Sequence, residues 1–92
     1  MSTELQEKIN HKQSLMPKYK VLLHNDDHNS MDYVVECLVK TVNILSAQQA
    51  YNIMIEAHNT GIGLVATVHL ELAEFYQECL QGYGLTATIE PE

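Results

Sequence analysis

Residues 18–38 read KYKVLLHNDDHNSMDYVVECL, and this stretch predicts how the chain folds. It begins with alternating polar and apolar residues that lead into an apolar run, a pattern typical of a β-strand over 18–24. The polar run 25–29 predicts a loop, and Ser30 is a suitable N-cap for a following helix. The apolar residues that follow helical spacing on one face of that helix are Met31, Val34, Val35, Leu38 and Val42.

The rest of the chain predicts two more helices and two more strands. Ser46 opens a capping box, so a second helix starts there, and Gly61 is a suitable C-terminal stop. A strand over 62–68, a helix over 70–81 and a short strand over 85–89 follow. The residues expected to face inward are Ala50, Ile53, Met54 and Ala57, with Tyr51 and His58 near that face, and then Leu72, Ala73, Tyr76, Cys79 and Leu80. This β-α-α-β-α-β order predicts an α+β fold with helices on one face of a small sheet, and leaves strand order and direction open.

The composition predicts one domain and restricts its partners. Residues 1–17 are polar and weakly periodic, so we expect a flexible N-terminal arm ahead of a core domain over 18–92. A net charge of −7 with only 5 Lys and Arg argues against nucleic acid, and no apolar run is long enough to span a membrane. The first residues lack the apolar region of a signal peptide, and the 2 cysteines form no CxxC motif. We therefore expect a monomer in a reducing cytoplasm.

The polar cluster HNDDHNSM at residues 24–31 allows four interpretations. A metal site could use its histidines and aspartates, but structural zinc sites favour Cys and His from two separate segments. An enzyme would need an activated nucleophile, yet Ser30 is better placed as a helix cap and no glycine elbow surrounds it. A helix cap alone accounts for only one or two of these polar residues. A receptor for a positively charged group would use the whole set.

A protonated amine is the cation that these acceptors suit. It offers three N–H donors and one charge, which a carboxamide oxygen, a carboxylate and a neutral imidazole nitrogen can accept. Asn25 and Asp27 supply the first two, and His58 supplies the third from the last turn of the second helix. Met31 and Met54, with Ala57, would then line an adjoining apolar pocket. The same residues can also be explained without a ligand. His58 would then be a core or capping histidine, and the apolar residues would be ordinary core.

Residues 19–38 and the helix end IMIEAHNTG at 53–61 closely resemble the ClpS family, and the resemblance covers residues 18–90. The run NDD-x-x-x-M and the downstream M-x-x-x-H are specific together. The His24–Asn25 and Val34–Val35 pairs look closest to cyanobacterial and plastid members. The resemblance implies a three-stranded antiparallel sheet packed on three helices. It also implies an adaptor that brings N-degron substrates to a ClpA- or ClpC-type AAA+ unfoldase with the ClpP peptidase, in the cytoplasm or a plastid stroma.

The resemblance also implies roles for individual residues, without catalytic residues, cofactor or metal. Asn25, Asp27 and His58 would hold the substrate's α-amino group, and Asp26 would contact the backbone just after it. Met31 would be the gatekeeper that excludes β-branched side chains. The residues implied to line the pocket for a first residue of Phe, Tyr, Trp or Leu are Leu23, Asn29, Val34, Met54, Ala57 and Leu85.

This sequence departs from the common family pattern at several positions. Ala57 stands where valine is usual, and Asn29–Ser30 replaces a Thr-Pro pair. The missing methyl groups should enlarge the pocket, which should favour bulky first residues. Binding of a first residue Leu should weaken by on the order of 1 kcal/mol per missing contact group. Glu71 matches a residue that docks on the unfoldase, whereas Tyr76 replaces a lysine that contributes to docking. An unfoldase-binding modulator that does not read N-termini, and a small metal-binding protein, remain the alternative functions.

Overall fold

The computed structural model describes residues 17–92, so the arm predicted over 1–17 lies, apart from Pro17, outside the described residues. The elements in chain order are β1 (Lys18–His24), α2 (Met31–Thr41), α3 (Ala47–Thr60), β2 (Ile62–His69), α4 (Leu70–Gly82) and β3 (Ala87–Pro91). The predicted β-α-α-β-α-β order and α+β class are therefore confirmed. None of the helices within residues 17–92 combines the length and apolar character that crossing a bilayer requires.

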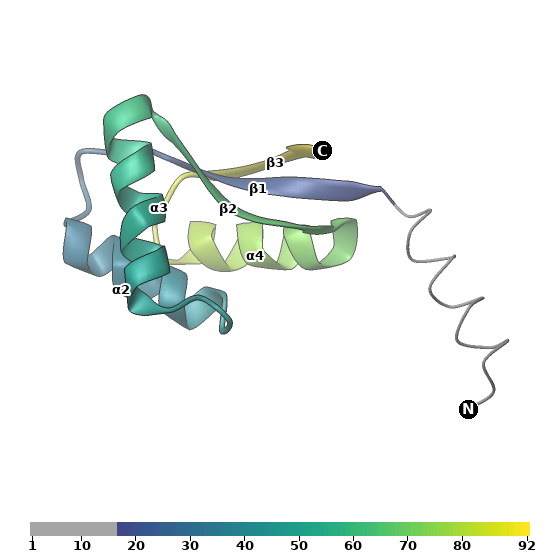
Figure 1. Cartoon of the computed structure of the whole chain (residues 1–92), viewed down its shortest axis with the longest axis horizontal. Coiled ribbons are helices and arrows are strands. Elements are labelled where there is room, and N and C mark those ends of the chain that lie inside the picture. The colour runs from purple at the N-terminus through teal and green to yellow at the C-terminus, as the bar shows by residue number, and fades with distance from the viewer. Residues whose placement is uncertain (1–16) are drawn as a thin grey trace, which may run out of the picture.

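The sheet has three strands in the order β2-β1-β3, and both pairings are antiparallel. The central strand β1 places Leu23 opposite Gly63 of β2 and Ala87 of β3. The register between β1 and β2 shifts at Val21, which pairs with Ala66 while the next residue pairs with Leu64. Figure 1 shows α4 running along one side of the sheet, with α3 crossing the sheet near its left-hand end.

Local capping fixes where α2 and α3 begin and where α3 ends. The Ser30 hydroxyl accepts the Tyr33 N–H at 3.2 Å and starts α2. Ser46 forms the predicted capping box at the start of α3. Gly61 ends α3 with φ at 93°, a left-handed conformation that glycine adopts without steric cost. All three predictions from local sequence are confirmed.

The core lies between the sheet and the helices, and Val21, Leu38 and Leu80 are among its fully buried members. The prediction that Leu72 faces inward is wrong. Leu72 is 41% exposed, because the buried face of α4 runs through Ala73 and Leu80 and leaves Leu72 on the solvent side. Tyr51, expected only near the inward face of α3, is exposed.

The last strand begins and ends two residues later than 85–89. The chain is still turning at Gly84 and Leu85, whose N–H groups bond back to carbonyls of α4. Leu85 is buried in the core before the strand begins. Pro91 is tolerated at the end of β3 because an edge strand needs only one side of its backbone for the ladder.

Candidate functional site

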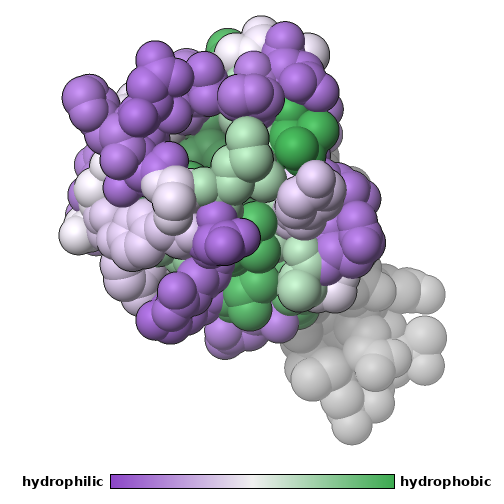
Figure 2. All heavy atoms as spheres, turned by 90° about the vertical axis from the view of Figure 1, so that its left-hand side faces the viewer, coloured by the Kyte–Doolittle hydropathy of each residue, from purple (hydrophilic) through white to green (hydrophobic). Residues whose placement is uncertain are grey.

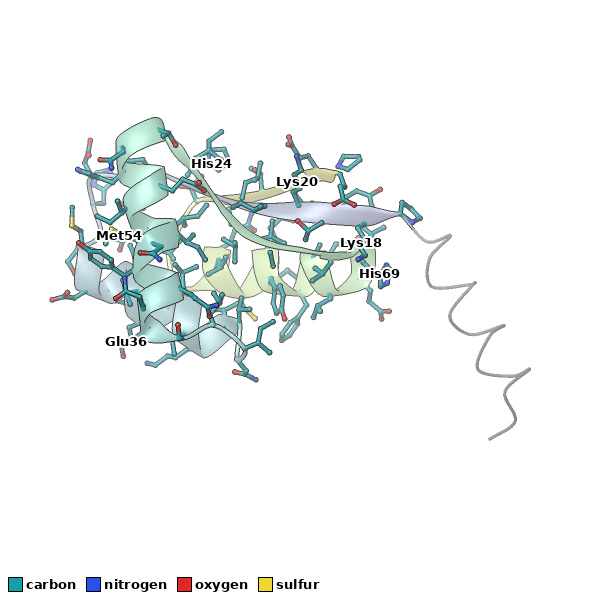
Figure 3. The ribbon with its side chains drawn as sticks, in the orientation of Figure 1. Lys18, Lys20, His24, Glu36, Met54 and His69 are labelled. Carbon is teal, nitrogen blue, oxygen red and sulfur yellow. The ribbon has the colours of Figure 1, made fainter. Side chains whose placement is uncertain are left out.

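One cavity of about 200 Å³ opens at the end of the molecule where the β1–α2 loop meets α3. Figure 2 looks onto this end and shows apolar surface recessed behind hydrophilic residues. Figure 3 shows Met54 of α3 and His24 at the end of β1 at the same end, whereas Lys18 and His69 lie at the other. The residues that line the cavity are Leu23, His24, Asn25, Asp26, Asp27, Asn29, Met31, Val34, Met54, Ala57 and His58.

Buried apolar side chains from three elements line the cavity. Leu23 comes from β1, Val34 from α2, and Met54 and Ala57 from α3. Met31 begins α2 and is 45% exposed, so it has apolar surface available beside the opening. The cavity is therefore an apolar recess that three elements must build together.

Three hydrogen-bond acceptors are exposed around the same cavity. Asn25 and Asp27 lie in the β1–α2 loop, and His58 lies in the last turn of α3. The Asn25 N–H donates to the Gly61 carbonyl at 3.0 Å, which ties this loop to the end of α3. Because His58 is exposed, it is not a core histidine. The two segments that the sequence separates by some thirty residues thus contribute to one site.

Asp26 organises the loop that carries these acceptors. Its Oδ1 accepts the N–H groups of His28 at 3.0 Å and Asn29 at 2.9 Å. The Asn29 Nδ2 donates to both carboxylate oxygens, at 3.3 Å to Oδ1 and 3.2 Å to Oδ2. Burial of the Asp26 carboxyl raises its pKa, but these bonds more than offset that effect and leave the pKa below its usual value. The carboxylate is therefore held charged and fixed in position.

Asn29 also connects this loop to the turn between α4 and β3. Its Nδ2 donates to the Gly84 carbonyl at 3.1 Å, and the Tyr33 hydroxyl donates to the neighbouring Tyr83 carbonyl at 2.6 Å. Gly84 has φ at 87°, so this turn depends on a glycine. Neither link can be predicted from local sequence, since the partners lie 50 or more positions apart.

Leu85 was expected in the pocket lining but does not line the cavity. It is 4% exposed and packs in the core behind the α4–β3 turn. His24 is the lining residue that the sequence did not predict. Its Nε2 lies 2.7 Å from the Thr88 hydroxyl, which joins the end of β1 to β3.

The histidines and aspartates of the loop do not form a metal-ligand set. Within residues 17–92, no three His, Cys, Asp or Glu side chains come together closely enough to hold a metal ion. Ser30 accepts the Tyr33 N–H as an N-cap, which is the role expected for it.

Glu71 and Tyr76, the residues expected at an unfoldase interface, both lie on α4. Glu71 is exposed in the first turn, whereas Tyr76 is half-buried against the core. Exposed Leu72 and Phe75 flank an open depression that Glu71 also lines. This surface is apolar and acidic and lies outside the cavity lining.

Comparisons with known proteins agree with the resemblance. A family model described as the ATP-dependent Clp protease adaptor protein ClpS matches residues 14–88. The ClpS adapter of the cyanobacterium Gloeobacter violaceus is 50% identical over 92 residues, covering 100% of this chain and 99% of the relative. A chloroplastic ClpS adapter of Chlamydomonas reinhardtii is 46% identical over 83 residues, 90% of this chain and 51% of the relative. The structure of Agrobacterium tumefaciens ClpS2 bound to L-phenylalaninamide matches with a TM-score of 0.75 and 29% identity, covering 83% and 98% of the two chains. The chain therefore belongs to the ClpS family of Clp protease adaptors, as a cyanobacterial or plastid-type member.

Proposed function

We propose that this adaptor binds the free N-terminal residue of N-degron substrates and delivers them to a ClpA- or ClpC-type AAA+ unfoldase with ClpP. The first residue would be Phe, Tyr, Trp or Leu. The adaptor would act by binding alone, without a chemical step or a cofactor. We place it in the cytoplasm, or in a plastid stroma if the source is a plant, because its relatives include cyanobacterial and chloroplastic proteins.

The observation that carries this proposal is the grouping of Asn25, Asp27 and His58 around one apolar cavity. An α-amino group has a pKa of about 8 and is mostly charged at neutral pH. Its three N–H donors match a carboxamide oxygen, a carboxylate and an imidazole nitrogen. Acetylation would remove the charge and two of the donors, so at most one of the three acceptors would still receive an N–H from the ligand.

The size of the cavity supports a single bulky side chain as the second part of the ligand. An engineered protein cavity of about 150 Å³ is enough to hold benzene, and this one measures about 200 Å³. The Agrobacterium relative was solved with L-phenylalaninamide, which carries a free amino group and an aromatic side chain. We infer that the side chain enters between Leu23, Val34 and Ala57. A Leu side chain would fill this space less well than Phe.

Asp26 and Met31 would define where the bound chain leaves the pocket. Asp26 Oδ1 already accepts three bonds, so only Oδ2 has capacity left for the N–H of the following peptide bond. Met31, half-exposed beside the cavity, would exclude side chains branched at Cβ.

The unfoldase would dock away from the pocket, on the surface around Glu71 and Tyr76. The exposed Phe75 and the acidic residues of α4 suit a partner surface that combines apolar and basic side chains. We propose residues 18–92 as the adaptor core and residues 1–17 as an N-terminal arm.

A panel of short peptides that differ only in the first residue, each free and acetylated, tests the proposal by fluorescence anisotropy. Free Phe-, Tyr-, Trp- and Leu-first peptides should bind, and their acetylated forms should not. Equal binding of both forms would favour a modulator that does not read N-termini, and calorimetric zinc binding would favour the metal-binding alternative.

Asn25→Ala is the matched variant, with Asn59→Ala as its control. Asn59 is exposed beside His58 but does not line the cavity. Loss of one hydrogen bond to a charged group should weaken peptide binding by roughly 10- to 100-fold in Asn25→Ala, while circular dichroism stays unchanged. If both variants bind alike, Asn25 is not an acceptor for the ligand, and if Asn25→Ala unfolds, the result favours a structural role for Asn25.

A further inference from the structure

Gly63 lies at a close contact between α3 and the sheet. It is buried on β2, and a Cβ at this position would overlap the carbonyl oxygen of Ile53. The same Cβ would lie 3.2 Å from the Ala57 backbone nitrogen and 3.3 Å from the Ile53 Cγ2. These atoms belong to the α3 turn that carries Met54 and Ala57, so the helix backbone rests directly on the strand.

The two sides of this contact are also two sides of the cavity. Gly63 pairs with Leu23 across the sheet, and Leu23 lines the cavity from β1. Met54 and Ala57 line it from α3, and His58 follows in the next position. The distance between α3 and the sheet therefore sets the distance between opposite walls of the cavity.

We propose that Gly63 sets the width of the pocket and is a positioning residue for first-residue selectivity, although it does not line the cavity. This inference rests on the proposed function. Ala57 makes the α3 wall small, and the close approach at Gly63 brings that small wall near Leu23. The pocket thus keeps contact with a side chain as small as Leu while still admitting aromatic rings.

Gly63→Ala would move α3 away from the sheet. The overlapping atom is backbone, which cannot rotate aside as the end of a flexible side chain does. A wider gap removes contacts from a small first side chain before it removes them from a large one. We expect the ratio of the Kd for a Leu-first peptide to the Kd for a Trp-first peptide to rise about fivefold or more.

Gly82→Ala is the matched control. Gly82 ends α4 outside the left-handed region, and a Cβ there would meet no atom within 4 Å. The ratio of the two dissociation constants should equal that of the wild type in Gly82→Ala.

Ala57→Val provides a second test that leaves Gly63 in place. If Gly63 holds α3 close, the added methyl groups take volume from the cavity, and Trp-first peptide should lose at least about fivefold in affinity relative to Leu-first. In the double variant Gly63→Ala/Ala57→Val, the wider gap should offset the added methyl groups and bring the ratio back toward that of the wild type. A double-mutant cycle measures this coupling.

The outcomes separate this inference from the proposed function. If the wild type binds no free N-terminal peptide, the proposed function is wrong. If the wild type binds but Gly63→Ala keeps the same ratio as Gly82→Ala, the role of Gly63 is wrong and the proposed function stands. If Gly63→Ala does not fold, Ala57→Val decides, because an unchanged ratio in that variant would show that α3 is free to move.

Discussion

Asn29→Ala removes the side chain that joins the β1–α2 loop to the α4–β3 turn. The alanine loses the bonds from Nδ2 to the Asp26 carboxylate and to the Gly84 carbonyl. It keeps its own backbone N–H bond to Asp26, as does His28. The variant therefore tests the link between the two loops while the local turn stays in place.

The expected loss follows from these two bonds. A hydrogen bond to a charged group contributes about 1.5–3 kcal/mol and a neutral one about 0.5–1.5 kcal/mol. The bond to Asp26 is partly buried and the bond to Gly84 is exposed, so water replaces part of each and the lower values apply. The free energy of unfolding should fall by about 2 kcal/mol, which lowers the Tm of a domain of this size by roughly 10 °C.

The pH dependence of this loss identifies the carboxylate as the partner. The pKa of Asp26 is lowered in the folded state, so its charged form stabilises the fold above an unfolded-state pKa of about 3.9. This contribution disappears as the pH falls through the folded-state pKa. The difference in unfolding free energy between wild type and Asn29→Ala should thus be full at pH 7 and shrink below about pH 4.

Urea unfolding at pH 7 and at pH 3 measures both values, with Asn43→Ala as the control. Asn43 is an exposed loop residue whose side chain has no hydrogen-bond partner within residues 17–92. Equal stability of the two variants, or a difference that is the same at both pH values, would refute the role assigned to the Asp26–Asn29 pair.

Three further perturbations test the core, a helix cap and the acceptors around the cavity. Leu38→Ala should cost about 2–5 kcal/mol of unfolding free energy in urea titrations, because Leu38 is fully buried. Ser46→Ala should cost about 1 kcal/mol by breaking the capping box and should leave peptide affinity unchanged in anisotropy titrations, since α3 begins far from the cavity. His58→Ala should weaken peptide binding in anisotropy titrations, because the α-amino group would lose one of its three acceptors around the cavity. His58→Gln, which keeps an acceptor, should retain more of the affinity than His58→Ala, and equal binding by His58→Ala and the wild type would exclude His58 as an acceptor.

Local sequence determined where the helices begin and end and which segments form the strands. Ser30, Ser46 and Gly61 cap their helices through backbone groups within four residues of themselves. Their roles can therefore be predicted without the tertiary structure. The strand over 18–24 was predicted correctly because its alternation and apolar run are local patterns. The resemblance to the ClpS family added the strand directions, which periodicity does not encode.

The tertiary structure decided the details of the site. The orientation of Leu72, the later start of β3 and the burial of Leu85 depend on what each residue packs against, and spacing along the chain does not specify that. The Asn29–Gly84 bond joins residues 55 positions apart, and the contact at Gly63 exists only because α3 folds back onto β2. The amino-acid types at Asn25, Asp27 and His58 follow from the sequence. Their arrangement around one cavity follows from backbone contacts between distant segments. Chain connectivity alone does not set the distance between the β1–α2 loop and α3, and these contacts do.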